Sequence, residues 1–493
     1  MKRTIIILLS LTLLISFALY SCQKGGDGNI KENSSADSDN GTADSLADDT
    51  SENGESPGDR NSIADNLPDI DYGGYTFNIL TGNEQYYVDS LVASEQIGEV
   101  INDAVYIANK TVEDRFNINI KVTQTEGPFI MDNAKKSIKS GGDEYDLLFG
   151  HDYESGTASL EGLFLNLYYL DRLDFEKPWW PNNTVESLTI NGKMYLFSNS
   201  LTTLGMDWTR LLYINKGLAK DLGLEVPYKD VFDGTWTLDK LTKLTKDVYI
   251  DVNGDGVKDS DDKYGYAFTG SYYCSIEPFG IQVVKKSGDI LELNVLGERT
   301  QKMVDMMYDL MINSKGTFYF GPEEHLSEKI FTNGNALIIY KHLQDARKTL
   351  RASDIDYGIL PFPKLDENQE NYYAGYHDRL FAVPITASNT DRSAVIIEAM
   401  SAEGWKKVFP AYYEISMKNK FLADEESIKI LDMIYSSRVL DFTYIYSISY
   451  YMMLNDLFNN DKPSTDFVSY YEKNLGSVQK TLDNIAKKFS EMD

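Results

Sequence analysis

The most constraining feature of this 493-residue chain is a regular alternation of strand-like and helix-like segments in its first third. Tyr75–Leu80 is rich in β-forming residues, Ile118–Val122 alternates apolar with polar residues, and Tyr145–Phe149 is short and apolar. Between them, apolar residues recur at helical spacing over 100–116 and 130–138, which is typical of amphipathic helices. This order predicts an α/β fold with a mainly parallel sheet and helices on both faces.

Polar residues follow two of the predicted strands directly. Asn83 and Glu84 come after the first strand, and His151 and Asp152 come after the third. Ligands of open α/β sheets bind beyond the carboxyl ends of the strands. Since any strand that enters a loop ends in polar residues, an ordinary turn is the alternative interpretation. The four residues are candidates for a ligand site.

The first 22 residues have the features of an export signal. Two basic residues precede an apolar run from Ile5 to Leu19, which is typical of a secretory signal and short for a membrane span. The sequence Leu19-Tyr20-Ser21-Cys22 resembles the bacterial lipobox. We therefore predict a signal peptide over residues 1–21, lipidation of Cys22, and anchoring to the outer face of the cytoplasmic membrane. A plain signal peptide and an uncleaved anchor are the alternatives.

Residues 22–70 are predicted to form a disordered acidic tether. Between Gln23 and Ile70 the chain has 12 acidic residues, 3 basic residues and no aromatic residue. Such a segment cannot bury enough apolar area to offset the loss of chain entropy on folding. The whole chain is also acidic, with a net charge of −29. This charge repels phosphate backbones, so we expect no nucleic-acid partner.

The segment Asp251–Asp262 matches the twelve-residue spacing of an EF-hand calcium loop. Gly256 stands where such a loop turns sharply. Calcium takes about six to eight hard oxygens, and this spacing wraps them around one point. We predict a structural Ca2+, with a solvated Asp/Gly turn as the alternative. The expected ligands are Asp251, Asn253, Asp255, the Val257 carbonyl, Asp259 and Asp262.

Motifs of familiar enzymes are missing from the sequence. There is no H-E-x-x-H, no phosphate-binding G-x-x-x-x-G-K-S/T, no G-x-S-x-G and no C-x-x-C. The four histidines lie far apart, and the two cysteines are too few for a disulfide framework. A carboxylate pair for glycoside hydrolysis stays open, because 76 acidic residues offer many pairs. We therefore predict that the chain is not an enzyme.

Seven short segments from about residue 177 onward stand in a recognisable order. They are Lys177–Trp180, Ile190–Tyr195, Leu212–Ala219, Gly234–Asp239, Phe331–Leu337, Tyr357–Lys364 and Pro410–Glu414. Together with the calcium-type loop, the ordered set resembles the extracellular solute-binding lipoproteins of carbohydrate ABC importers. The resemblance runs from about residue 72 to 490. It implies a two-lobe, periplasmic-binding-protein-like (type II) fold with a hinge between the lobes.

The resemblance also implies lobe boundaries. The N-terminal lobe is expected to comprise 71–204 plus 336–386, and the C-terminal lobe 205–335 plus 387–493. The chain is expected to cross between lobes near Leu201–Trp208, Ile338–His342 and Pro384–Ala387. Two aromatic features have open interpretations. Trp179-Trp180 fits a sugar platform or a plug between lobes, and the apolar stripe over 467–489 fits a partner helix or, more simply, docking on its own lobe.

Sugar sites combine aromatic platforms with polar side chains that pair with hydroxyl groups. Strand ends and expected lobe crossings together nominate such residues. The candidate ligand-binding residues are Asn83, Glu84, His151, Asp152, Asp207, Trp208, Tyr272, Tyr273, Tyr340, His342, Tyr376 and His377.

The resemblance implies capture of a ligand, with no chemical step. The chain would bind a sugar or oligosaccharide, close around it at the hinge and deliver it to the permease subunits of an ABC transporter. A second interpretation keeps the fold but assigns a peptide ligand or a signalling partner. A third is a surface glycosidase, which would release reducing sugar.

Overall fold

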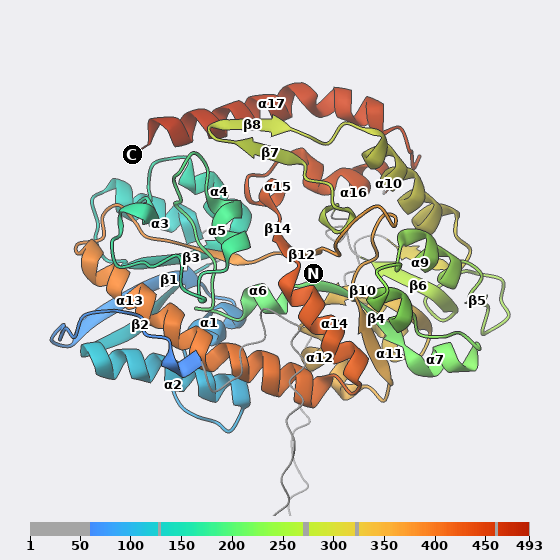
Figure 1. Ribbon diagram of the computed structural model, residues 1–493, viewed down its shortest axis with the longest axis horizontal. Helices are drawn as coiled ribbons and strands as arrows, with labels where there is room; N and C mark the ends of the chain where they lie inside the picture. The colour runs from blue at the N-terminus through green and yellow to red at the C-terminus, as the bar shows by residue number, and fades with distance from the viewer. Residues whose placement is uncertain (1–59, 127–129, 270–275, 321–324, 459–461, 493) are drawn as a thin grey trace, which may run out of the picture. The chain divides into compact units, whose positions relative to one another are not determined.

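The computed structural model describes residues 60–126, 130–269, 276–320, 325–458 and 462–492 (Figure 1). The predicted signal peptide, Cys22 and most of the predicted tether lie outside these ranges, as do the candidate residues Tyr272 and Tyr273. Within the described ranges, no helix is both long enough and apolar enough to cross a membrane.

The first sheet has four strands in the order β13-β3-β1-β2. The strand β1 (Tyr75–Gly82) lies parallel to both β2 (Ile118–Thr125) and β3 (Leu147–His151), whereas β13 (Arg379–Ala382) lies antiparallel to β3. The predicted strand–helix alternation is therefore confirmed. The third strand begins two residues later than its apolar run.

The helix α2 (Val100–Phe116) has the bounds that the spacing of its apolar residues predicts. Its N-cap is Glu99, whose carboxylate accepts from two backbone N–H groups of the first turn, and its C-cap is Asn117, in the left-handed conformation. Its apolar face is covered by the helix α13 (Thr390–Glu403), which lies beside it (Figure 1). Since α13 packs on a helix of the first sheet, the prediction that all of 387–493 belongs to the C-terminal lobe is wrong.

The second sheet has the order β11-β4-β10-β6-β5, with β9 also paired to β6. Its strands are β4 (Arg210–Asn215), β5 (Tyr249–Ile250), β6 (Lys263–Thr269), β9 (Thr317–Phe320), β10 (Ala336–His342) and β11 (Tyr357–Leu360). The assignment of 336–386 to the N-terminal lobe is therefore wrong for β10 and β11. A fully buried strand such as β10 fits either sheet by composition, and its place depends on non-local pairing, here Ile338 opposite Ile214.

The crossings between the two sheets also differ from the expected ones. The first follows the short helix α6 (Leu204–Asp207) into β4, as predicted. The segment 338–342 is no crossing, because it lies inside β10. The chain returns to the first sheet between β11 and β13, through β12 (Ala374–Tyr376), and Pro384 already bridges to Phe164 in the first lobe.

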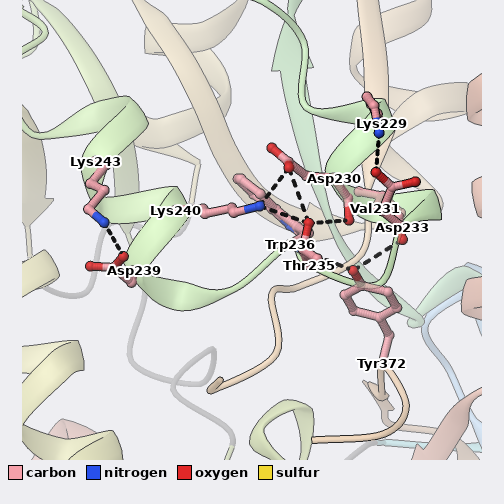
Figure 2. Close-up of polar contacts among 10 residues, drawn as sticks. All are labelled: Lys229, Asp230, Val231, Asp233, Thr235, Trp236, Asp239, Lys240, Lys243 and Tyr372. Carbon is pink, nitrogen blue, oxygen red and sulfur yellow. Dashed lines mark hydrogen bonds and ion pairs between the residues drawn. The ribbon is translucent and has the colours of Figure 1, made fainter. Parts of the chain in front are cut away.

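The segment Gly234–Asp239, part of the family resemblance, has a structural role (Figure 2). The Trp236 backbone N–H donates to the Tyr372 hydroxyl at 3.2 Å, and its indole N–H donates to a backbone carbonyl at 3.1 Å. The Lys240 ammonium bonds Asp230 Oδ1 at 2.6 Å and Thr235 Oγ1 at 2.7 Å. These bonds fix the entry to the helix α9 (Leu238–Thr245) against the end of β11.

Trp179 and Trp180 are core residues. Both are buried, and their indole N–H groups donate to the two carboxylate oxygens of Glu398 on α13, at 2.8 and 2.9 Å. The interpretation as a sugar platform is therefore wrong, because neither ring is accessible to a ligand. The C-terminal helix α17 (Phe467–Glu491) packs on β8 (Ile290–Leu293) and on α10 (Glu298–Tyr308). Its apolar stripe is thus covered within this chain, as the simpler interpretation predicted.

The tether ends earlier than predicted. Residues 60–70 are described, and Asp65 forms an ion pair of 2.5 Å with Arg115 on α2. The Arg60 guanidinium lies 4.6 Å from the ring centroids of Trp405 and Phe409. This segment therefore belongs to the folded part, because few but well-placed contacts replace the apolar area that its composition lacks.

The remaining short elements complete the chain. Those in the first half are η1 (Arg60–Ser62), α1 (Gln85–Leu91), α3 (Ile130–Lys139), α4 (Asp152–Ser159), η2 (Leu167–Tyr169), α5 (Asn182–Leu188), α7 (Lys216–Asp221) and α8 (Tyr228–Phe232). Those in the second half are η3 (Glu277–Phe279), β7 (Val284–Ser287), η4 (Asp309–Asn313), α11 (Leu326–Thr332), α12 (Asp345–Lys348), η5 (Leu350–Ala352), η6 (Gly404–Val408), η7 (Ala411–Phe421), α14 (Glu425–Ser436), β14 (Arg438–Leu440), α15 (Phe442–Ile445), η8 (Ser449–Met452) and α16 (Met453–Phe458).

Candidate functional site

A buried polar network begins at Asp152, the first residue of α4, directly after β3. Its side chain is 1% exposed and lies 2.6 Å from His151 Nδ1, 3.3 Å from His377 Nδ1 and 3.9 Å from Arg379 Nη1. Burial alone would raise the pKa of this carboxyl, but the contacts with the two imidazoles outweigh burial and hold the pKa well below its ordinary value. Asp152 is therefore ionised at neutral pH.

The network extends to the second sheet through Arg210, the first residue of β4. Its guanidinium contacts Nε2 of His377. A guanidinium has only donors, so Nε2 accepts and the proton of His377 sits on Nδ1, which donates to Asp152 Oδ2. Burial first, and then the charge of Arg210, lower the pKa of His377, which agrees with a neutral ring. The contacts from Arg210 through His377 to Asp152 thus connect β4 of the second sheet to α4, the helix that follows β3 of the first sheet.

Aromatic rings surround this network. The Arg379 guanidinium lies 5.3 Å from the centroid of the Trp208 ring and donates to the Tyr86 hydroxyl at 3.2 Å. The ring centroid of Trp208 lies 5.0 Å from that of His342, and that of Tyr444 lies 4.2 Å from that of His377.

His342 is the second histidine near Arg210. Burial first, and then the charge of Arg210, hold the pKa of His342 well below its ordinary value. At neutral pH the Asp152 carboxylate therefore lies among the guanidinium groups of Arg210 and Arg379 and the neutral imidazoles of His342 and His377.

A pocket of about 460 Å³ opens next to the network. Its walls come from α5, from the segment between η3 and β7, from Tyr373, and from the end of β14 with the start of α15. Glu277 and Asp441 line it and also lie close to Arg210: burial first, and then the Asp441 carboxylate, raise the pKa of Glu277 well above its ordinary value, while Arg210 opposes the rise. The charges of the pocket wall and of the network therefore act on each other: Arg210 acts on Glu277, and Asp441 acts on His377.

Five of the candidate ligand-binding residues come together in this network. They are His151, Asp152, Trp208, His342 and His377. Asn83 and Glu84 lie exposed at the start of α1, on the same edge of the first sheet, and no described contact joins them to the network.

Three other candidates are buried in structural contacts. Asp207 forms a 2.6 Å ion pair with Arg347 and accepts from the Tyr412 hydroxyl at 2.6 Å. The ring of Tyr340 packs against Phe362 with centroids 4.7 Å apart.

Tyr376 is the third, and its hydroxyl bonds Thr184 Oγ1 at 2.8 Å. All three side chains are 2% exposed, so their contacts with this chain leave little surface for a ligand.

The network also contains residues that the sequence did not nominate. They are Tyr86, Arg210, Glu277, Arg379, Asp441 and Tyr444. The two arginines carry a signal that was available: each opens an otherwise apolar strand, Arg210 before Leu-Leu-Tyr-Ile and Arg379 before Leu-Phe-Ala. A buried charge needs a partner: Arg210 contacts His377, which lies next to the first sheet, and Arg379 lies beside Asp152 and Tyr86. Glu277 and Asp441 carry no such signal, because many acidic residues lie in loops.

The loop Asp251–Asp262 has the turn of a calcium loop, but its carboxylates bond within the chain. Gly256 has a φ of 73°, and its N–H donates to Asp251 at 3.0 Å. The buried Asp262 accepts from Val252 N at 3.1 Å and from the Tyr249 hydroxyl at 3.0 Å. Across the described ranges, no three His, Cys, Asp or Glu side chains are grouped so as to hold a metal ion. Of the other expected ligands, Asn253, Asp255 and Val257 are exposed and Asp259 is half-buried.

Comparison with known proteins shows the fold. No protein-family model matches the chain, and a search among curated proteins also finds no match. Among solved structures, the galacto-N-biose-/lacto-N-biose I-binding protein of a Bifidobacterium longum ABC transporter, in complex with lacto-N-biose, is 12% identical with a TM-score of 0.56, covering 84% of this chain and 99% of that one.

Two further structures agree. A cyclo/maltodextrin-binding protein complexed with maltotetraose is 15% identical with a TM-score of 0.53, covering 84% of this chain and 96% of that one. The GacH receptor of Streptomyces glaucescens, solved unliganded and with acarbose, is 13% identical with a TM-score of 0.52, covering 85% of this chain and all of that one. The chain therefore has the two-lobe, type II fold of periplasmic binding proteins, as the sequence predicted.

Proposed function

We propose that the chain captures a sugar or oligosaccharide and delivers it to an ABC import permease. The observation that carries the proposal is the site itself: a pocket of about 460 Å³, next to a buried network that links the two sheets. The solved structures with the same fold are described as binding lacto-N-biose, maltotetraose and acarbose. In such a protein, the ligand shifts the population toward the closed arrangement, which a permease then recognises.

The lining of the pocket suits a sugar. The rings of Phe442 and Tyr373 are half-buried in its wall, and sugar rings pack their apolar faces on such side chains. Glu277, Asp441 and Asn183 supply carboxyl and amide groups that pair with hydroxyl groups. No covalent step is needed, so the proposal is binding without catalysis.

A thermal-shift screen of the chain without its first 22 residues tests this proposal. Ligands that bind only the folded state raise the melting temperature. We expect a rise with one class of neutral mono- or oligosaccharide, confirmed by calorimetry, with the sugar recovered intact by mass spectrometry. A rise with peptides alone would favour the second interpretation, and release of reducing sugar would favour a glycosidase.

Export and lipidation at Cys22 belong to the same proposal, because capture for import requires a position outside the cytoplasmic membrane. The supporting observation is the apolar run followed by Leu19-Tyr20-Ser21-Cys22. Metabolic labelling with a palmitate analogue is expected to mark the full-length chain. The variant Cys22→Ser is expected to lose the label, and a labelled variant would contradict the assignment.

A further inference from the structure

We infer that the carboxyl groups of Glu277 and Asp441 select the ligand: the site takes neutral or amino sugars, whose groups donate hydrogen bonds, and rejects sugars that carry a carboxylate. The inference rests on the proposed function and names the substrate class of that site. It begins from the position of the two residues, Glu277 in η3 and Asp441 just before α15, whose side chains lie next to each other in the lining of the pocket.

Asp441 is held rigidly at the pocket wall. Its Oδ1 accepts from Thr443 N at 2.8 Å, from Thr443 Oγ1 at 2.6 Å and from Tyr444 N at 3.2 Å, which makes it the N-cap of α15. The side chain is 6% exposed. These three bonds all end on Oδ1, which leaves Oδ2 outside the cap. A fixed carboxylate of this kind is a pre-organised acceptor for a ligand hydroxyl or amine.

Glu277 is the adjustable member of the pair. In the described part of the chain its buried Oε2 has no hydrogen-bond partner, and an unsatisfied buried oxygen costs free energy that a ligand donor recovers. Its pKa is raised by burial and by the neighbouring Asp441. The two side chains place carboxyl oxygens side by side in the pocket, and these oxygens can accept from neighbouring hydroxyl groups of a sugar.

The charges around the pocket disfavour an anionic ligand. Among the described lining residues, Lys286 is the one cation, and its ammonium donates to the backbone carbonyls of Glu186, Ser187 and Thr189 at the end of α5. Arg210, whose charge opposes the rise in the pKa of Glu277, contacts His377 and is not among the lining residues. A ligand carboxylate in the pocket would therefore meet Glu277 and Asp441 with Lys286 as the one described cation of the lining, and desolvating that charge would be unfavourable.

Calorimetry with matched probes tests the inference. The probes are neutral oligosaccharides of two to four units, glucosamine dimers and trimers, and di- and trigalacturonic acid. We expect the unaltered chain to bind a neutral or amino probe at least about 10-fold more tightly than the galacturonic acids, a factor that corresponds to one hydrogen bond to a charged group. Tighter binding of a galacturonic acid would overturn the inference, although it would leave sugar capture standing.

Two variants test whether Glu277 and Asp441 cause the preference for neutral or amino sugars. Glu277→Gln and Asp441→Asn are each expected to weaken binding of the preferred probe about 10- to 100-fold and to narrow the preference over galacturonic acid. Asn is itself a good N-cap, so Asp441→Asn keeps α15 in place. The control is Glu186→Gln, an exposed carboxylate on the same pocket, for which we expect less than about a 3-fold change, as is usual for exposed charges.

Two further outcomes of these binding measurements separate the inference from the proposed function. Folded Glu277→Gln and Asp441→Asn variants that bind the neutral probe as tightly as the unaltered chain would overturn the inference while the proposed function stands. Failure of the unaltered chain to bind any probe would count against both.

Discussion

The Asp152 carboxylate compensates the positive charge of the buried Arg379 guanidinium in the network between the sheets. The variant Asp152→Asn would leave the Arg379 guanidinium buried beside a neutral side chain. We expect the free energy of unfolding to fall by about 3 kcal/mol, as is typical when one member of a buried pair is removed, measured by urea denaturation at pH 7. The control is Asp391→Asn, whose partner Arg172 and own side chain are exposed; we expect a change below about 1 kcal/mol there.

The same residue predicts a pH dependence. Because the pKa of Asp152 is lower in the folded than in the unfolded chain, its contribution is present at neutral pH and is lost as the pH falls below about 4. The difference in unfolding free energy between the unaltered chain and Asp152→Asn should therefore shrink on acidification. A difference that stays constant from pH 7 to pH 3 would contradict the ionised state of Asp152.

Glu398 gives a pH dependence of the opposite sign. Burial raises the pKa of Glu398 to about 7, although the two indole N–H groups oppose the rise. The folded chain therefore takes up a proton that the unfolded chain does not, and stability increases as the pH falls from 8 toward 5, by at most about 1.4 kcal/mol per pH unit from this group. In the variant Glu398→Gln, the unfolding free energy should therefore depend less on pH between pH 5 and 8. If denaturation series show the same pH dependence for the variant and the unaltered chain, the raised pKa of Glu398 is contradicted.

Among the elements, the loop Asp251–Asp262 makes the clearest prediction. We propose that it binds a structural Ca2+, because Gly256 supplies the turn and the expected oxygens follow calcium-loop spacing. Millimolar Ca2+ should raise the melting temperature by several degrees, and chelator should reverse the rise. The variants Asp251→Asn and Asp255→Asn should abolish the shift, whereas Asp239→Asn, in an exposed pair outside the loop, should keep it. No shift with the unaltered chain would make the loop an Asp/Gly turn.

The elements also show what the sequence can predict. The bounds of α2 follow from local information, since apolar spacing and terminal caps are read within one segment. The place of β10 does not, because all seven of its residues are buried and such a run fits any central strand position. Its neighbour β4 precedes it by more than 100 residues. The lobe boundaries failed for this reason.

The candidate site likewise contains residues that the sequence could predict and residues that it could not. His151 and Asp152 were predictable because they lie at the carboxyl end of a strand, where open α/β sheets bind ligands; His151 is the last residue of β3 and Asp152 follows it. Tyr340 and Tyr376 were nominated from strand ends and expected lobe crossings taken together, but they pack into the core. Glu277 and Asp441 meet only through the tertiary fold, and their local sequence gives no sign of it.

For the whole molecule, the prediction concerns the coupling of ligand binding to the relative position of the two lobes. Trp208 lies on the crossing between them, half-buried, with its ring near Arg379 and His342. The other four tryptophans are at most 7% exposed, so a hinge motion changes their surroundings little. Sugar binding should therefore change the intrinsic fluorescence mainly through Trp208.

The variant Trp208→Phe tests this coupling. It should remove most of the ligand-induced fluorescence change, while calorimetry still detects binding, because Phe keeps an aromatic ring beside the Arg379 guanidinium. The control Trp405→Phe removes a tryptophan that packs against Trp179 with ring centroids 6.1 Å apart, and it should keep the change. If Trp208→Phe binds sugar and retains the full fluorescence change, another tryptophan reports binding, and the prediction that Trp208 reports the motion of the crossing is wrong.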